Sequence, residues 1–345
     1  MIQIVEPSAE IISGLSPAEK IEKAARTCYK SEKESTVAER DKFIYGLMKS
    51  KHFAMLEHAV FTFLLNKKAA KRLYELPTLL KFVDVSKIIT FGETHVLVSV
   101  NFRTLLEQSF LFYPLMLPVI EEFKDYPLVQ KFIRDSSNIY TEKDKIPFDV
   151  FPKALRKWIA EADTDDIVLA DLSKVSGLNF LHISSNLFIT LKLVTDRGIS
   201  HELVRHRIAS YAQESSRYCD YNKKGVQVIK PCSFDKFKES DKAVWFNAVQ
   251  IAADSYENLI KEGLRPQIAR SVLPTCLKTE IVVTANVREW FHILDLRLVG
   301  TTGNPHPDMQ YLMTKAYPLI KAEIEKYQAF ISPEGFKKYD AILKK

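Results

Sequence analysis

The first clear block of apolar positions along the chain has helical spacing. Ser16-Pro17-Ala18-Glu19 has the residues of a helix N-terminus, with a capping serine, a proline in the first turn and an acidic residue three positions after the serine. The apolar residues that follow recur every three or four positions, which predicts a helix that ends near Lys30. The same spacing predicts a second helix over 37–48.

Short apolar runs rich in β-branched and aromatic residues predict strands between these helices and the rest of the chain. His58–Leu65 (HAVFTFLL) has the composition of a strand that is buried on both faces, and Leu187–Val194 (LFITLKLV) has that of another. Shorter strands are predicted over 226–229 and 281–284. We therefore expect the sheet residues to come from distant parts of the sequence.

Helical spacing returns in the last third of the chain. A helix over 241–260 is predicted to be amphipathic, with an apolar face made of Val244, Trp245, Ala248, Val249, Ala252, Tyr256 and Leu259. Further helices are predicted over 287–298 and from Asp308 onward. Helices and strands do not alternate regularly, so an α+β fold, a sheet flanked by helices, is favoured over a doubly wound parallel sheet.

Composition places the chain among globular proteins. Its 345 residues are 46% hydrophobic and 27% charged, which allows one sizeable core, and we expect a single domain over 1–345. No apolar run has the length of a membrane span, and no signal peptide is evident. The four cysteines form no CxxC pair, which favours a reduced, cytoplasmic location.

Glycine and arginine change this picture more than the net charge does. The 10 glycines form neither GxGxxG nor GxxxxGK, which argues against a Rossmann dinucleotide site and a P-loop. The net charge of +6 alone says little, but residues 197–297 hold eight arginines whereas the rest of the chain has six. Because arginine binds phosphate and carboxylate through two parallel hydrogen bonds, this window is the candidate anion-binding region.

The densest part of that window is 196–221, where Arg205, His206, Arg207 and Arg217 stand among serines and tyrosines. Such a set offers charge and many hydrogen-bond donors to a phosphate. Other interpretations are a solvated basic helix and a nucleic-acid surface, since arginine and tyrosine can stack on bases. A metal site is rejected, because His201 and His206 are five residues apart, about 140° out of line on a helix, whereas HExxH needs four.

Arg205-His206-Arg207, followed after seven residues by Ser215 and then by Arg217-Tyr218, resembles the signature of the flavin-dependent thymidylate synthases. Other segments resemble that family in the same order: Ala24–Tyr29, His52–Phe63, Ala269–Pro274, Thr284–Arg288 and Leu296-Arg297. Together these segments fall within about 16–66 and 187–299. Roughly 67–186 lies between them and is expected to be an insertion or subdomain.

The resemblance implies a family-specific α+β fold and an enzyme that converts dUMP to dTMP. The one-carbon unit would come from 5,10-methylenetetrahydrofolate, and the reducing equivalents from NADPH through bound FAD. It also implies a homotetramer with active sites between subunits, without nucleic-acid or membrane partners. Two alternatives remain: a relative that binds nucleotide or flavin without turnover, and an RNA-binding or RNA-modifying protein.

By motif position, the resemblance assigns residues of these segments to ligands. The expected dUMP ligands are Glu202, Leu203, Val204, Arg205, Gln213, Glu214, Ser215, Ser216, Arg217, Arg270 and Arg297. The expected FAD contacts are His52, Ala54, Arg205, His206, Arg207, Gln213, Asn286, Arg288 and His292. Arg297 and Ser215 are the catalytic candidates: Arg297 would favour loss of the uracil N3 proton. Ser215 lies where a nucleophile could attack, but no base is evident nearby, so we favour a ligand role.

Three further features qualify these assignments. His58, beside an apolar strand, has the setting of a core histidine. Arg288 and Arg297 are nine residues apart on one predicted helix and should project from opposite faces, so we hypothesise that this helix serves two different sites. Asn101-Phe102-Arg103 echoes the Asn-x-Arg of 286–288, but the echo is too short to assign a role.

Overall fold

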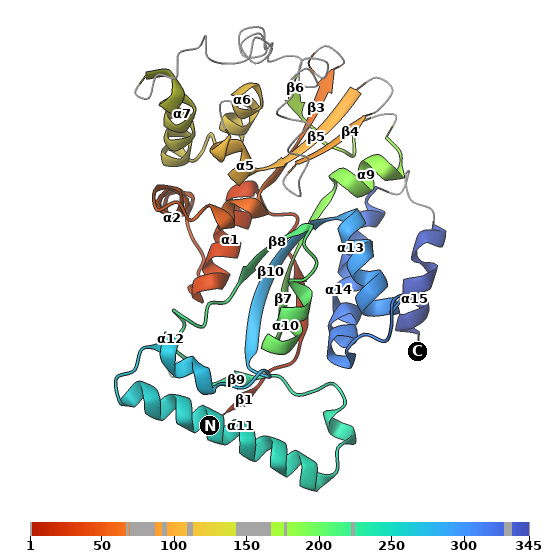
Figure 1. The fold of residues 1–345 in the computed structure, drawn as a ribbon. Helices are drawn as coiled ribbons and strands as arrows, with labels where there is room; N and C mark the ends of the chain where they lie inside the picture. The colour runs from red at the N-terminus through yellow and green to blue at the C-terminus, as the bar shows by residue number, and fades with distance from the viewer. Residues whose placement is uncertain are drawn as a thin grey trace.

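The computed structural model describes residues 2–66, 69, 87–91, 95–108, 113–142, 167–175, 178–221, 225–327 and 333–344. The strands are β1 (Gln3–Ile4), β2 (Ser8–Ile11), β3 (Val60–Asn66), β4 (Lys87–Phe91), β5 (His95–Asn101), β6 (Ile167–Leu169), β7 (Phe188–Asp196), β8 (Ala209–Gln213), β9 (Gln227–Val228) and β10 (Lys278–Asn286). Figure 1 shows that they lie between groups of helices.

The helices come from both halves of the chain. The α-helices are α1 (Pro17–Tyr29), α2 (Val37–Lys49), α5 (Phe102–Glu107), α6 (Tyr113–Glu122), α7 (Pro127–Glu142), α9 (Phe180–Asn186), α10 (Arg197–Leu203), α11 (Glu239–Lys261), α12 (Pro266–Ala269), α13 (Val287–Leu294), α14 (Pro307–Glu325) and α15 (Lys337–Leu343). Shorter 3-10 turns are η1 (Phe53–His58), η5 (Phe234–Lys236), η6 (Arg270–Val272) and η9 (Pro333–Phe336), and η7 (Asp295–Val299) is a π-helix. The mixture of helices and antiparallel sheets confirms the α+β class.

The central sheet has the antiparallel order β2-β7-β10-β8. Side chains alternate between the faces of a strand, so neighbours along β10 contact different helices. Val282 packs with Ala24 of α1, whereas Ile281 and Val283 belong to the core that includes Trp290 of α13. The sheet is therefore covered on both faces, and β8 forms one edge (Figure 1).

A second antiparallel sheet has the order β4-β5-β3-β6. The strand predicted at 58–65 is present, but it begins at Val60 and His58 belongs to η1. The prediction that both of its faces are buried is wrong: Phe61, Phe63 and Leu65 are buried, and the residues between them are half-buried. This alternation arises because one face packs on the core and the other is less covered.

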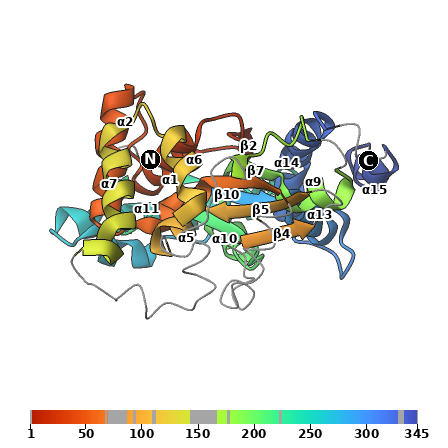
Figure 2. The same ribbon diagram turned by 90° about the horizontal axis from the view of Figure 1, so that it is seen from above.

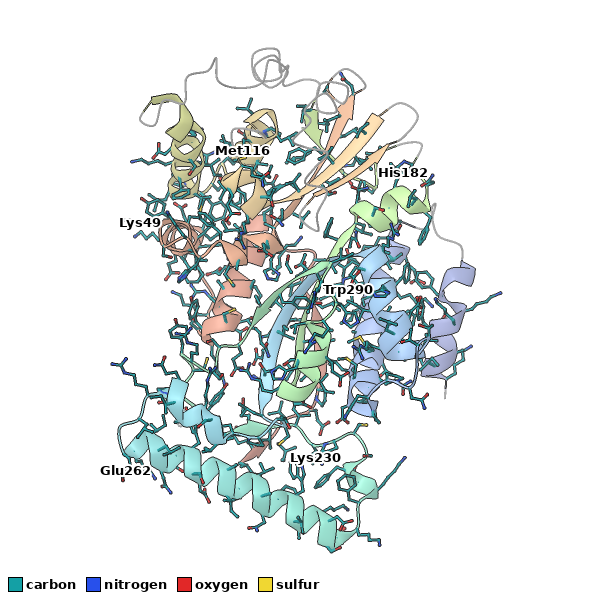
Figure 3. The ribbon with its side chains drawn as sticks, viewed as in Figure 1. Lys49, Met116, His182, Lys230, Glu262 and Trp290 are labelled. Carbon is teal, nitrogen blue, oxygen red and sulfur yellow. The ribbon has the colours of Figure 1, made fainter. Side chains whose placement is uncertain are left out.

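Figure 2 shows α1, α2, α6 and α7 at one end of the molecule and α13, α14 and α15 at the other, with the strands between them. One apolar core joins the first helix group to β3 and β5. Another joins β7 and β10 to α13 and α14. Trp290 is fully buried in this second core, where its indole Nε1 donates to the carbonyl of Ile189 at 3.0 Å (Figure 3).

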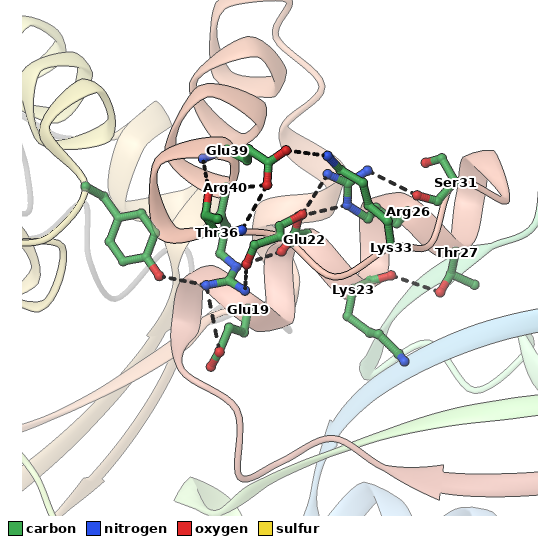
Figure 4. A network of polar contacts seen from close by, with 12 residues as sticks. Glu19, Glu22, Lys23, Arg26, Thr27, Ser31, Lys33, Thr36, Glu39 and Arg40 are labelled. Atoms are coloured by element: carbon green, nitrogen blue, oxygen red, sulfur yellow. Dashed lines mark hydrogen bonds and ion pairs between the residues drawn. The ribbon is translucent and has the colours of Figure 1, made fainter.

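The N-terminal helices confirm the start signals in the sequence. Ser16 caps α1 and Thr36 caps α2, each in a capping box with the glutamate three residues later. The buried carboxylate of Glu22 then joins the two helices: it accepts from Arg26 Nε at 2.8 Å and from Arg40 Nε at 2.6 Å (Figure 4).

Two predictions in the C-terminal half need correction. The helix predicted at 241–260 exists as α11, but Val244 and Ala248, assigned to its apolar face, are exposed. The core instead takes Val249, Ala253 and Tyr256, so the buried stripe is narrower than the apolar pattern. The helix predicted at 287–298 is not one α-helix, because it widens into the π-helix η7 after Leu294.

Two general properties concern the fold as a whole. No helix in the described part of the chain is both long enough and apolar enough to cross a membrane. Much of the region 67–186, where we expected an insertion, lies outside the described residues. Its described portions supply β4, β5 and β6 and the helices α5, α6, α7 and α9.

Candidate active site

The arginine motif occupies the connection between α10 and the edge strand β8. Asp196, the last residue of β7, caps α10 by accepting from the backbone N–H of Ile199 at 2.8 Å. The chain leaves α10 at Leu203 and enters β8 at Ala209, so 204–208 form a short loop. This loop therefore presents Arg205, His206 and Arg207 at the edge of the central sheet.

His206 is the buried member of the motif, and hydrogen bonds at this residue stabilise the loop. Its Nδ1 lies 2.9 Å from the carbonyl oxygen of Leu203, and Tyr211 donates its hydroxyl to the His206 carbonyl at 2.6 Å. Burial lowers the pKa of His206, which favours the neutral ring. Its ring also meets that of His292, with centroids 6.0 Å apart. The structure thus brings these two predicted site residues together.

Arg205 and Arg207 point outward on either side of this histidine. Both side chains are exposed, and no described carboxylate lies within ion-pair distance of either guanidinium. An exposed arginine without a carboxylate partner keeps its donors for an anion. The loop therefore offers two available guanidinium groups close together in sequence.

A second group of donors gathers just after β8. The backbone N–H of Ser215 donates to the carbonyl of Cys28 at 2.8 Å, which ties the turn to α1. The Ser215 hydroxyl accepts from the backbone N–H of Arg217 at 3.3 Å. Arg270 donates through Nη1 to the Ser216 hydroxyl at 2.8 Å, across 54 residues of sequence. Arg270 and the two serines thus lie together at this turn, which Arg217 joins through its backbone N–H while its guanidinium lies over the Tyr218 ring, 5.6 Å from the centroid.

Gln213 and Glu214 face into the protein and support this cluster. Gln213 Nε2 donates to the hydroxyl of Ser200 at 2.8 Å and to that of Thr279 at 3.2 Å. Glu214 is 1% exposed, with its Oε2 3.3 Å from Lys278 Nζ. Glu214 is placed to hold the turn through its ion pair.

Glu202 and Arg297 connect α10 to the π-helix. Arg297 Nη1 donates to Glu202 Oε2 at 3.1 Å, and Arg297 Nε is buried without a hydrogen-bond partner. A buried N–H without an acceptor is costly, so this donor is suited to an incoming acceptor. Leu203 is buried and Val204 half-buried beside this pair.

Asn286 and Arg288 are not brought to the motif loop by any contact. Asn286 caps α13 by accepting from the backbone N–H of Glu289 at 2.9 Å, and its Nδ2 donates to the carbonyl of Ser185 at 3.0 Å. Arg288 is exposed and has no carboxylate partner among the residues described. The prediction that Arg288 and Arg297 project from opposite faces assumed one α-helix, whereas Arg297 lies in the π-helix η7, so it stays a prediction.

The segment 52–58 has exposed residues at its start and a buried histidine at its end. His52 and Ala54 are exposed, and His52 Nδ1 lies 3.3 Å from the Tyr29 hydroxyl. His58 is 1% exposed, with Nδ1 2.9 Å from the hydroxyl of Thr284. Burial lowers the pKa of His58 to about 3. His58 is therefore a neutral core histidine, as its apolar setting predicted.

A pocket of about 230 Å³ beside β8 contains residues that sequence reasoning missed. Glu57 bridges it: Oε1 accepts from Arg103 Nη1 at 2.8 Å and Oε2 from the Ser210 hydroxyl at 3.1 Å. The lining residues are Glu57, Val60, Asn101, Arg103, Thr104, Glu107, Gln108, Phe188, Ile208, Ala209, Ser210 and Thr284. The Asn101-x-Arg103 echo was the sequence signal that could have drawn attention to this pocket.

Another cavity, of about 650 Å³, lies between α1 and α2. It is lined by the charged groups shown in Figure 4, among them Glu22, Arg26 and Arg40. These charges are already paired with one another, so few donors are left for a ligand. Among the described residues, no group of three or more His, Cys, Asp or Glu side chains could hold a metal ion.

Flavin-dependent thymidylate synthases are among the known proteins that this chain resembles in sequence. Over 144 residues the chain is 36% identical to a flavin-dependent thymidylate synthase of Geobacter sulfurreducens, which covers 41% of this chain and 60% of the relative. It is 35% identical over 141 residues to one of Pyrococcus abyssi, which covers 40% of this chain and 57% of the relative. The chain thus spans less than two thirds of the length of these relatives.

A solved structure and a family model complete the comparison. A UMP/dUMP methylase, PolB from Streptomyces cacaoi bound with 5-Br dUMP, is 22% identical, with a TM-score of 0.34 over 42% of this chain and 74% of that one. The family model described as thymidylate synthase complementing protein matches residues 10–69 and 182–324. These segments make up more than half of the chain and contain the arginine motif. The chain belongs to the family of the thymidylate synthase complementing proteins.

Proposed function

We propose that the chain is a flavin-dependent thymidylate synthase that methylates dUMP to dTMP. In this proposal 5,10-methylenetetrahydrofolate supplies the one-carbon unit and NADPH supplies the reducing equivalents through FAD. The observation that carries the proposal is the set of guanidinium groups around β8, with Arg205, Arg207 and Arg217 exposed and free of described carboxylates. Such groups suit two phosphate-bearing ligands rather than a merely solvated surface.

The residues of the motif loop fit the needs of FAD. A pyrophosphate requires several donors at one place, and Arg205 and Arg207 provide them from a loop that His206 holds rigid. His52, Ala54 and His292 are exposed and accessible to a bound cofactor. When bound, FAD would supply the redox chemistry, while the residues of this chain bind and orient it.

The cluster after β8 fits the phosphate of dUMP. We assign Arg217, Arg270, Ser215 and Ser216 to that phosphate, because Arg270 donates to Ser216 and the exposed Arg217 belongs to the same turn. Glu202, Leu203, Val204, Arg205 and Gln213 would surround the rest of the nucleotide, and buried Glu214 would hold the turn. This division separates the nucleotide phosphate from the cofactor pyrophosphate by the length of β8.

Arg297 is assigned to the pyrimidine ring. Its Nε lacks an acceptor in the described chain, and its Nη1 is fixed by Glu202. A fixed guanidinium that donates to the ring carbonyl favours the anionic form of the pyrimidine and so promotes loss of its N3 proton. Ser215 accepts from Arg217 N–H, and no described base contacts its hydroxyl, which supports a ligand role rather than nucleophilic attack.

We also propose that 1–345 is a single domain with an inserted region over 67–186. The family model leaves 70–181 unmatched, which supports this division. A homotetramer with sites between subunits and a cytoplasmic location complete the proposal. Exposed Val244 and Ile251, seven residues apart on α11 at 70% and 57% exposure, support an assembly that covers this helix. Light scattering of the purified protein tests the tetramer.

The activity is tested by following the hydrogen at C5 of the uracil ring. Purified protein with FAD, methylenetetrahydrofolate and NADPH should release tritium from [5-³H]dUMP, and omission of NADPH should stop net formation of dTMP. The purified protein should also carry a flavin that is identified as FAD after release. A flavin-loaded protein that releases no tritium would contradict the proposed activity.

A further inference from the structure

The two sheets of the protein repeat one another strand by strand. The order β6-β3-β5-β4 corresponds to β2-β7-β10-β8, and every junction between strands is antiparallel in both. The registers also agree: Leu64↔Val168, Thr62↔Ser99 and Ser99↔Ile88 in one sheet match Lys192↔Glu10, Thr190↔Thr284 and Thr284↔Ser210 in the other. We call β6, β3, β5 and β4 the first repeat and β2, β7, β10 and β8 the second repeat.

The repeats share their hydrogen bonds as well as their register. The hydroxyls of Thr62 and Ser99 lie 2.8 Å apart, and those of Thr190 and Thr284 lie 2.9 Å apart. The backbone N–H after each long strand, at residues 102 and 287, bonds to the carbonyl of residues 59 and 187 respectively. Such agreement in detail indicates an internal duplication.

The asparagine at the end of each central strand caps the helix that follows it in both repeats. Asn101 caps α5 by accepting from Thr104 N at 2.9 Å, and Asn286 caps α13 by accepting from Glu289 N at 2.9 Å. An arginine follows two residues later in each case, Arg103 and Arg288. The two Asn-x-Arg segments thus occupy equivalent positions in the two repeats.

Contacts between the repeats are reciprocal, as in a twofold interface. His58 precedes β3 and bonds through Nδ1 to Thr284 of β10 at 2.9 Å. Its counterpart Asn186 precedes β7 and accepts from Ser99 of β5 at 2.8 Å. Because each repeat gives the other the same contact, they are related by an approximate twofold axis within one chain.

The arginine motif belongs to the second repeat alone. Arg205-His-Arg207 begins five residues before Ser210 of β8. The equivalent position, five residues before Ile88 of β4, begins Val83-Asp-Val85, in a segment outside the described residues. The edge strands β8 and β4 therefore pair in the same way, but the residues that precede them in the sequence differ in charge and hydrogen-bonding groups.

The twofold relation places the arginine of the first repeat at the motif of the second. Arg103 reaches β8 through Glu57, which contacts both Arg103 at 2.8 Å and Ser210 at 3.1 Å. The pocket there includes Ile208, next to Arg207 in the motif loop. By the same relation, Arg288 belongs beside β4, where the motif is missing.

We infer that Arg103 is a ligand-binding residue of the motif site and that it serves the motif of its own chain in place of Arg288, for which the family resemblance implied an FAD contact. Arg103 Nη1 and Nε are held by Glu57 and Glu107, and its side chain is 40% exposed in the pocket. The two carboxylates disfavour a phosphate here. Apolar walls from Val60 and Phe188, with an adjacent guanidinium and carboxylate, suit the imide edge of a heteroaromatic ring, which offers both carbonyls and an N–H.

This inference rests on the proposed function, because flavin and uracil are the ligands there that carry an imide edge. The matched variants Arg103→Ala and Arg288→Ala remove the same group from equivalent positions. Arg103→Lys keeps the positive charge but lacks the planar guanidinium that makes two parallel hydrogen bonds. Each protein is freed of flavin and titrated with FAD by fluorescence quenching and with dUMP by calorimetry. Thermal unfolding is measured in parallel.

We expect Arg103→Ala to weaken the binding of one ligand at least tenfold, Arg103→Lys to weaken it less, and Arg288→Ala to change either affinity less than threefold. A loss for FAD identifies the flavin ring, and a loss for dUMP identifies the uracil ring. Unchanged affinities in Arg103→Ala, or a loss in Arg288→Ala of equal or greater size, overturn the inference. A wild-type protein that binds neither ligand would instead overturn the proposed function, so the two failures are distinguishable.

Discussion

The two repeats have the same strand framework and yet offer different surfaces. At the edge of the second repeat, the loop before β8 exposes Arg205 and Arg207, and the turn after it joins Ser216 to Arg270. At the edge of the first repeat, β4 pairs with β5 in the same register but lacks the arginine motif in the sequence before it. The proposed arginine ligands of the second repeat therefore lie in the loops beside its edge strand, and the paired strands position those loops.

The interiors of the repeats differ as well. Lys192 of β7 is buried between Glu280, at 2.6 Å, and Glu32. The equivalent position in β3 is Leu64, a half-buried apolar residue. The second repeat thus contains a buried network of charged side chains at this position. The first repeat has an apolar side chain there instead.

The largest effect is expected from removing the guanidinium that distinguishes the turn after β8. Arg217→Ala should raise the Kd for dUMP about 100-fold, about 3 kcal/mol, because a charge-assisted contact to the phosphate is lost. The retention of FAD should change little, since the turn is assigned to the nucleotide. Calorimetric titration with dUMP and the flavin content after gel filtration measure the two effects.

Arg265→Ala is the control for Arg217→Ala, because Arg265 is also exposed and lies five residues before Arg270. It removes the same charge from the surface and should leave both affinities within about twofold, as expected for a screened surface charge. Equal losses of dUMP and FAD in Arg217→Ala would show that the turn does not separate the two ligands.

The second effect concerns the buried charges. Lys192→Leu installs the residue of the first repeat and should lower the free energy of unfolding by about 2 kcal/mol. Removal of one partner from a buried pair costs about 3–5 kcal/mol, and here Glu280 keeps its ion pair with Lys278. Urea unfolding measures the loss. Lys23→Leu, which breaks the more exposed pair with Glu10, should change stability by less than about 0.5 kcal/mol.

The same substitution has a pH signature. Burial raises the pKa of Glu280, but Lys192 and Lys278 outweigh burial and lower it to about 2. The stability from this carboxylate is therefore present above its ordinary pKa of 4.5 and is lost as the pH falls toward 2. Lys192→Leu should lose less stability than the wild type in this window. Parallel acid-unfolding curves would contradict the assignment of the pKa shift to Lys192.

Local signals in the sequence were enough for several elements and for the motif. Ser16 and the glutamate after it predicted the start of α1, because a capping box is formed within four residues. The ligand candidates from Arg205 to Arg217 were found for the same reason, since they are close in sequence. The π-helix after Leu294 was missed, because an apolar period does not separate it from an α-helix.

Long-range pairing set the limit of what could be predicted. The sequence echo at Asn101-x-Arg103 was visible, but its role depends on β3 and β5 pairing as β7 and β10 do. The equivalent strands are separated by different lengths of chain, so no single repeat period appears in the sequence. The contact of Glu57 with Ser210 joins residues 153 positions apart, which no local pattern reports.

An effect of about the same size is expected where the repeats differ in a polar contact. Burial lowers the pKa of His58 from 6.5 to about 3, so the folded protein binds fewer protons than the unfolded chain between these values. Stability is then full above about pH 6.5 and falls as the pH falls toward 3. His58→Asn installs the residue that Asn186 provides in the other repeat and removes this titration.

Between pH 7 and pH 5 the wild type should lose about 2 kcal/mol more than His58→Asn, from about 1.4 kcal/mol for each pH unit below 6.5. Urea unfolding at both pH values measures the difference, and it is independent of any loss of stability that the substitution causes at pH 7. Identical pH dependence in the two proteins would show that another group carries the acid sensitivity.

The smallest effect tests the equivalence of the repeats themselves. Thr62→Val and Thr190→Val each remove one hydroxyl from the matched pairs with Ser99 and Thr284. Each change should lower the free energy of unfolding by about 1 kcal/mol, because the remaining hydroxyl loses a hydrogen-bond partner in the interior. The loss should be larger for Thr190, which is 1% exposed, than for half-buried Thr62. If the repeats are energetically as well as geometrically equivalent, the two losses will differ only by this burial. A loss of stability in one variant and none in the other would show that the two repeats share their strand register but not the contribution of this hydrogen bond to stability. Other contacts would then stabilise the repeat that loses nothing.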